Sequence, residues 1–198
     1  VLFAKGWPMV CGVIFLLSVA VYFFLRDESR KTMILRWIAG TAMTLFLLRA
    51  LLLTYATYSL WSHTLPGKYL VPPYQPISYF LQYSFFHFFV SFFLALALGF
   101  VVGGILLFLN YLRPHLLIPG DLSLFLIGIL LVRWPMALLY IGALFIGSFL
   151  LLLFQGYIIR GKEKVVFSMH ILFWIPLFLF FGNQFVVFFG MSALVMPL

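Results

Sequence analysis

The sequence predicts an all-α membrane protein, a polytopic bundle of about six transmembrane helices that forms one domain over residues 1–198. Of the 198 residues, 66% are hydrophobic and only 8% are charged, whereas soluble chains have about 25% charged residues. The mean hydropathy is +1.21. A small domain leaves much of its surface exposed, so a chain this apolar requires lipid as its solvent.

Six apolar runs are long enough to be helices in a membrane, since about 20 apolar residues span the hydrocarbon core. The first is expected to be an anchor, because charged residues rather than a small-residue cleavage pattern follow it. The fourth is short and is expected to end at Trp134-Pro135, because the residue before a proline is disfavoured in a helix. The expected spans are 7–25, 36–60, 79–111, 121–134, 136–159 and 166–190. The expected loops are 26–35, 61–78, 112–120 and 160–165.

The basic residues predict the orientation of these spans. Loops on one side carry eight of them: Arg26, Arg30, Lys31, Arg36, Arg113, Arg160, Lys162 and Lys164. The other side carries three: Lys5, Lys68 and Arg133. The richer side is expected to be cytoplasmic, which places both termini on the non-cytoplasmic side. The net charge of +8 then reflects topology and contact with anionic lipid, and no nucleic-acid partner is expected.

The four acids, Asp27, Glu28, Asp121 and Glu163, are all predicted on the cytoplasmic face. Asp121 has a structural explanation as the cap of a helix start, and Asp27 as the partner of Arg30 or Lys31. Two carboxylates at one depth on different helices could also share a proton, giving one base and one acid. Such a pair would support aspartic proteolysis without a metal or cofactor, and neither is expected, because the single cysteine excludes a multi-cysteine site.

From Gly120 to Phe181 the chain resembles the type IV prepilin peptidases, intramembrane aspartic proteases with a Gly-x-Gly-Asp motif. Gly120-Asp121 matches the end of that motif, and Asp27 with Arg30 and Ile34 is similar to the first aspartate region. The resemblance implies a bacterial or archaeal inner (plasma) membrane hydrolase that cuts the leader peptide of a pilin-like precursor at the cytoplasmic face. It also implies Asp27 and Asp121 as the catalytic pair, and Gly120 and Ser123 as substrate-binding residues.

The sequence departs from the family pattern at several motif positions. Ile118 stands at the first glycine of the motif, Ser123 stands at a usual lysine, and only Phe167 is kept from a Pro-Phe-Gly-Pro stretch. These departures favour an alternative, a non-catalytic polytopic subunit that packs beside neighbouring subunits of a larger membrane complex. The placement of the two aspartates favours the protease. A transporter is a third hypothesis, and the sequence shows no charged pathway that would support it.

Three other polar residues, His87, His170 and Arg49, are candidates for chemistry. His87 and His170 are predicted near opposite membrane faces, which argues against a haem held between them. Arg49 is expected in the middle of its span, roughly 18 Å from either helix end at 1.5 Å per residue. A structural role or the carboxylate of a partner subunit is the expectation for Arg49.

Overall fold

The computed structural model describes residues 2–112, 117–118, 120–158 and 167–191, and within them every regular element is a helix. Four helices are long and apolar enough to cross a membrane: Gly6–Phe24, Glu28–His63, Ile77–Leu112 and His170–Phe188. Two shorter apolar helices, Asp121–Val132 and Met136–Leu150, accompany them. The predicted class, an all-α membrane bundle, is confirmed.

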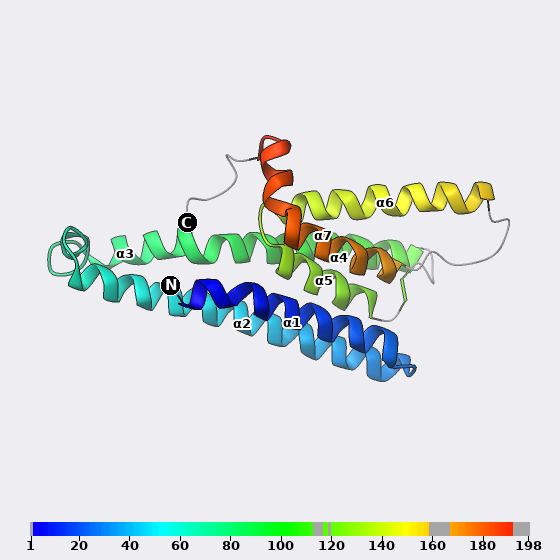
Figure 1. The fold of residues 1–198 in the computed structure, drawn as a ribbon, viewed down its shortest axis with the longest axis horizontal. Helices are drawn as coiled ribbons and strands as arrows, with labels where there is room; N and C mark the ends of the chain where they lie inside the picture. The colour runs from blue at the N-terminus through cyan, green and yellow to red at the C-terminus, as the bar shows by residue number, and fades with distance from the viewer. Residues whose placement is uncertain (1, 113–116, 119, 159–166, 192–198) are drawn as a thin grey trace.

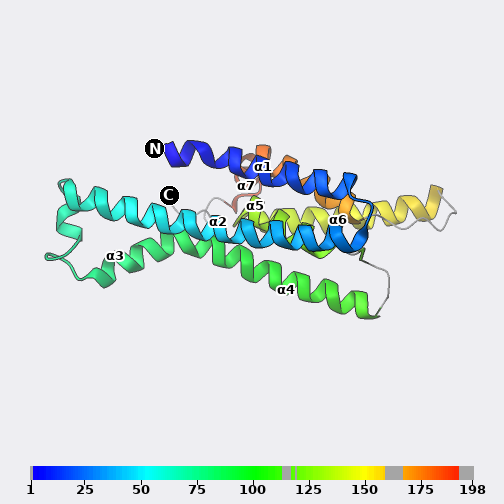
Figure 2. The ribbon, with the colours of Figure 1, turned by 90° about the horizontal axis from the view of Figure 1, so that it is seen from below.

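Helices α1 (Leu2–Phe24) and α2 (Glu28–His63) form an antiparallel hairpin (Figures 1 and 2). The predicted loop 26–35 is wrong for most of its length, because α2 already begins at Glu28. Asp27 caps this helix, and the Lys31 ammonium pairs with the Glu28 carboxylate at 2.7 Å. These two local interactions stabilise a first helical turn whose charged residues, read alone, indicate a loop.

After α2 the chain turns and runs back beside it as a second long helix. After the 3₁₀ turn η1 (Gly67–Leu70) come α3 (Ile77–Ser84), the π-helical turn η2 (Phe85–Phe89) and α4 (Val90–Leu112). They run without a break from Ile77 to Leu112, so the predicted span 79–111 is confirmed as a helix. The end of α2, η1 and α3 extend beyond the other helices, at the left of Figure 2.

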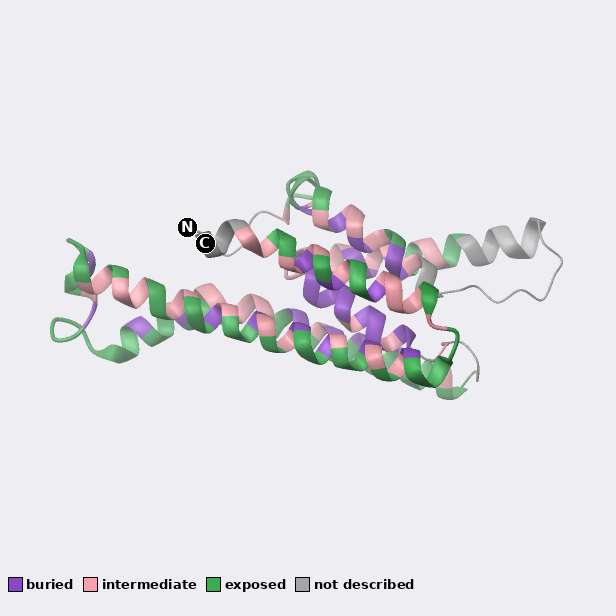
Figure 3. Cartoon of the chain, turned by 60° about the horizontal axis from the view of Figure 1, so that its bottom comes forward, coloured by how far each residue is buried: buried purple, intermediate pink, exposed green. Residues whose placement is uncertain are grey.

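Helix α5 (Asp121–Val132) occupies the centre of the bundle, where it contacts α2, α4, α6 and α7. All of its residues except Leu122 and Leu126 are buried, and it forms much of the purple core in Figure 3. Twelve residues measure about 18 Å, so α5 is too short to cross the ~30 Å hydrocarbon core. Its burial shows that neighbouring helices surround it.

Helices α6 (Met136–Ile158) and α7 (Phe167–Phe188) pack against each other and complete the core. Helix α7 bends in Figure 1 and contains Pro176, whose ring removes one helical hydrogen bond. Tyr140 of α6 is fully buried, and its ring requires a glycine opposite it. A Cβ at Gly128 would lie 2.8 Å from Tyr140 Cζ and 3.2 Å from Ile175 Cδ1.

Candidate functional site

Asp27, the first predicted catalytic residue, is an exposed helix cap. Its Oδ1 accepts hydrogen bonds from the backbone N–H groups of Ser29 at 3.0 Å and Arg30 at 3.4 Å. Its Oδ2 lies 3.3 Å from Arg30 Nε, and the Asp27 side chain is 52% exposed. The expected ion pair with a nearby base is confirmed for Arg30, while Lys31 pairs with Glu28.

Asp121, the second predicted catalytic residue, is only 1% exposed and begins α5. Its Oδ2 accepts a hydrogen bond from Ile118 N–H at 2.9 Å, and its own N–H donates to Ile118 O at 3.1 Å. The sequence predicted that this carboxylate caps the helix. The described bond instead closes the turn before α5, and Gly120 occupies the N-cap position. The carboxylate still lies at the positive end of the helix dipole.

Gly120 brings the start of α5 against α2. It has a φ of 102°, a left-handed conformation that glycine adopts readily. A Cβ at Gly120 would lie 3.1 Å from Leu35 Cδ1 and 3.8 Å from Thr32 Oγ1. A side chain at this position would therefore press on α2. The close approach is to a helix of the same chain, whereas the resemblance implied an approach to substrate.

The contact with Thr32 and Leu35 places the two aspartates at the same end of the bundle on neighbouring helices. The level of Gly120 lies about 8–12 Å along α2 from Asp27, at 1.5 Å per residue. Asp27 is exposed and Asp121 is buried. The structure thus brings the two acids to one end, which we call the basic end because it carries Arg26, Arg30, Lys31 and Arg36. The two carboxylates nevertheless have different surroundings, since that of Asp27 is exposed to solvent and that of Asp121 is buried.

Ser123, the other predicted substrate-binding residue, is 8% exposed within α5. Ten of the twelve residues of α5, Ser123 among them, are buried. Its position favours a packing role.

A second group of polar residues lies away from the basic end. Arg49 Cζ is 4.8 Å from the centre of the Trp7 ring, and Arg133 Cζ is 5.4 Å from the same centre. Arg133 also lies 5.1 Å from the Phe46 ring centre. Arg49 and Arg133 line one cavity together with His87 and Ser91. The structural role expected for Arg49 is consistent with its stacking on Trp7.

The sequence indicated Arg133 only as a marker of topology, and this cluster was not predicted. Trp7, Arg49 and Arg133 lie on α1, on α2 and at the end of α5, far apart in the sequence. A basic residue directly before Trp134-Pro135, where a buried helix must end, is the one signal that could have drawn attention to it.

His87 and His170 lie in different helices and have separate environments. His87 Nδ1 donates a hydrogen bond to Tyr83 O at 2.9 Å, and the two rings stack at 3.9 Å. His170 Nε2 is buried without a hydrogen-bond partner. Among the described residues, no three histidine, cysteine or acidic side chains gather into a group that could hold a metal ion.

Comparison of the chain with protein-family models, with curated proteins and with solved structures gave no match.

Proposed function

We propose that this protein is a non-catalytic polytopic subunit of a larger membrane complex. The observation that carries the proposal is the local engagement of both candidate catalytic carboxylates. Asp27 caps α2 and pairs with Arg30, and Asp121 holds the turn before α5 through Ile118. In this proposal both acids stabilise the bundle and neither activates water.

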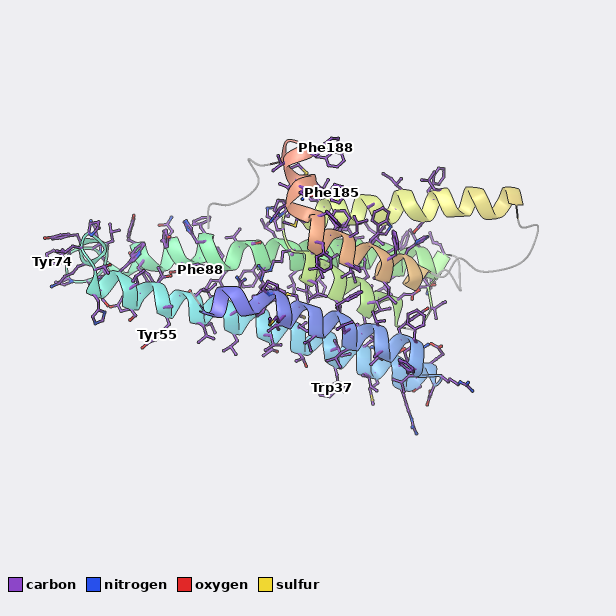
Figure 4. The ribbon with its side chains drawn as sticks, in the orientation of Figure 1. Trp37, Tyr55, Tyr74, Phe88, Phe185 and Phe188 are labelled. Carbon is purple, nitrogen blue, oxygen red and sulfur yellow. The ribbon has the colours of Figure 1, made fainter. Side chains whose placement is uncertain are left out.

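The surface of the bundle supports a role in a membrane assembly. Large apolar side chains are exposed along its length, among them Trp37 at 72%, Tyr55 at 73% and Phe188 at 81%. Trp37 and Tyr55 point away from the bundle on one side of α2 (Figure 4). Such a surface suits lipid and neighbouring transmembrane helices, which pack by shape rather than by a hydrophobic driving force.

The proposed orientation places the basic end in the cytoplasm, because cytoplasmic loops carry an excess of lysine and arginine. The α1–α2 turn and the start of α5 both lie at this end. The amino-terminal end of α1 then faces the opposite side of a bacterial or archaeal inner membrane.

The mass of the complex in native membranes tests this proposal. Membranes are solubilised in a mild detergent, and the tagged chain is analysed by blue native electrophoresis and native mass spectrometry. We expect a defined assembly with a fixed stoichiometry, which persists in the double variant Asp27→Asn/Asp121→Asn. A wild-type chain that runs only as a 22.8 kDa monomer would overturn the proposal.

An aspartic endopeptidase is the second candidate function. It is favoured by the meeting of Gly120 with Thr32 and Leu35, which places Asp27 and Asp121 on neighbouring helices at one end. Catalysis would require Asp27 to leave its helix cap and approach the buried Asp121. The substrate would be the leader end of a pilin-like precursor, and Asp27→Asn or Asp121→Asn would abolish its cleavage.

A further inference from the structure

A small cavity between α2, η2, α4 and α5 carries two arginines. Its volume is about 70 Å³, and Arg49, Arg133, His87 and Ser91 contribute the polar part of its lining. Phe46 and Phe92 contribute to its apolar wall. One water molecule needs about 10–15 Å³ of such space. The cavity therefore has room for a few water molecules or for a group of about the size of a phosphate, but not for a whole lipid or a peptide.

The two guanidinium groups have aromatic neighbours and no described acidic partner. The ion pairs among the described residues join Arg30 to Asp27 and Lys31 to Glu28, both at the basic end. Asp121 lies at the opposite end of α5 from Arg133, about 18 Å away along the helix axis. Two like charges that share one aromatic ring repel each other, so an anion between or beside them would stabilise the cluster.

Two buried hydrogen-bond donors in this cluster are unused. Arg133 Nη2 and Trp7 Nε1 are both inaccessible to solvent and have no hydrogen-bond partner. Buried donors in folded proteins are almost always bonded, and guanidinium groups favour the paired oxygens of carboxylates and phosphates. Two other polar side chains of the lining have backbone partners: Ser91 Oγ donates to Trp134 O, and His87 Nδ1 donates to Tyr83 O.

The backbone at Arg133 points to a functional reason for this arginine. Its φ is 66° and its ψ is 167°, and it is the one residue other than glycine with a positive φ among the described residues. This combination of angles is strained for any residue with a Cβ. Glycine would fit the conformation better, so stability of the turn does not account for the arginine.

The distance from the basic end to the cluster is close to the thickness of a bilayer's hydrocarbon core. Arg49 is about 32 Å along α2 from Glu28, which is close to the ~30 Å thickness of the hydrocarbon core. Trp7 lies at the start of the apolar span Gly6–Phe24, the end opposite the α1–α2 turn, and tryptophan favours the membrane interface. With the basic end at one interface, as in the proposed orientation, this distance would place Arg49, Trp7 and Arg133 near the other interface, and Arg49 would then lie outside the middle of the membrane, where the sequence predicted it.

We propose that this cavity binds a phosphate-type oxyanion, supplied by the head group of an anionic lipid or by phosphate in solution. Arg49 and Arg133 both line the cavity and supply the positive charge. The site is independent of the two aspartates and of the role assigned to them.

Binding is tested on the purified full-length chain in detergent with three probes: dioleoyl-phosphatidylglycerol, inorganic phosphate, and dioleoylglycerol as the lipid without a phosphate. Thermal unfolding followed by tryptophan fluorescence gives the apparent affinity, and native mass spectrometry gives the stoichiometry. We expect phosphatidylglycerol to raise the unfolding midpoint up to a plateau as its concentration increases, and one molecule to be retained per chain in native mass spectrometry. Dioleoylglycerol is expected to do neither. An equal effect of inorganic phosphate would identify free anion as the source.

Three variants decide whether the effect belongs to this cavity. Arg49→Gln and Arg133→Gly are expected to weaken binding about tenfold or more, the factor for a lost hydrogen bond to a charged group. Arg133→Gly suits the backbone and folds without the strain, so loss of binding there is not loss of structure. Arg36→Gln, which removes an exposed charge at the basic end, is the matched control and is expected to bind normally. The proposal is overturned if neither phosphate probe stabilises the wild type, or if Arg36→Gln weakens binding as much as Arg49→Gln.

Discussion

Replacement of Asp121 by alanine and by asparagine is expected to have different effects on stability. Asp121 is 1% exposed, and its Oδ2 accepts the Ile118 N–H at 2.9 Å. A hydrogen bond to a charged group contributes about 1.5–3 kcal/mol, and a negative charge in the first helical turn adds about 0.3–1 kcal/mol. Asp121→Ala should therefore destabilise the bundle by about 2–4 kcal/mol. Asp121→Asn keeps an oxygen that can accept the Ile118 N–H, so this variant should lower the free energy of unfolding by only about 1 kcal/mol.

The assay is thermal unfolding in detergent, followed by tryptophan fluorescence. For a chain of this size 1 kcal/mol shifts the midpoint by about 2–4 °C, so Asp121→Ala should unfold about 4–16 °C below the wild type. Ser123→Ala, at a buried position two residues further along α5, is the matched control and should shift the midpoint less. A rise in the midpoint for Asp121→Ala would refute the reasoning. It would mean that the buried carboxylate destabilises the fold, as catalytic residues often do.

Three further predictions concern single positions. Asp27→Ala should cost about 1 kcal/mol through loss of the α2 cap, whereas Asp27→Asn should be nearly neutral because asparagine caps equally well; the unfolding midpoints of the two variants check this. Gly128→Ala should destabilise the fold by about 1–3 kcal/mol through overpacking against Tyr140. Tyr140→Phe removes a buried hydroxyl without a partner, so it should stabilise the fold by itself and should restore part of the stability lost in the Gly128→Ala variant when the two are combined; the unfolding midpoints of the three variants check this. Arg133→Gly should raise the midpoint without ligand, because relief of about 1–3 kcal/mol of backbone strain exceeds the entropic cost of glycine, about 0.5–1 kcal/mol.

Local sequence patterns were sufficient for the fold class and for most helix positions. The helix after Trp134-Pro135 begins at Met136, as the proline predicts. The start of α2 was missed because a run of charged residues resembles a loop. In the structure Asp27 caps the first turn and Glu28 pairs with Lys31. These interactions depend on helical geometry, which brings residues three positions apart together and which the charged run by itself does not indicate.

The candidate site could be predicted only in part, because it depends on contacts between distant segments. The sequence placed Asp27 and Asp121 on the same membrane face, and the packing of Gly120 on Leu35 is consistent with that placement. The hydrogen bonds that engage each carboxylate depend on backbone geometry that no motif encodes. The cluster of Trp7, Arg49 and Arg133 was missed for the same reason, since three helices must pack before these side chains meet.

Cleavage of a pilin-like precursor tests most directly the claim that Asp27 and Asp121 are structural. The purified chain, in its wild-type form and as Asp27→Asn/Asp121→Asn, is incubated in anionic nanodiscs with a precursor that carries its leader, and the products are measured by mass spectrometry. Since both carboxylates hold local structure, we expect no leader removal by either form and a double variant that folds. Removal of the leader by the wild type, abolished in the folded double variant, would contradict the account and assign the two aspartates to catalysis.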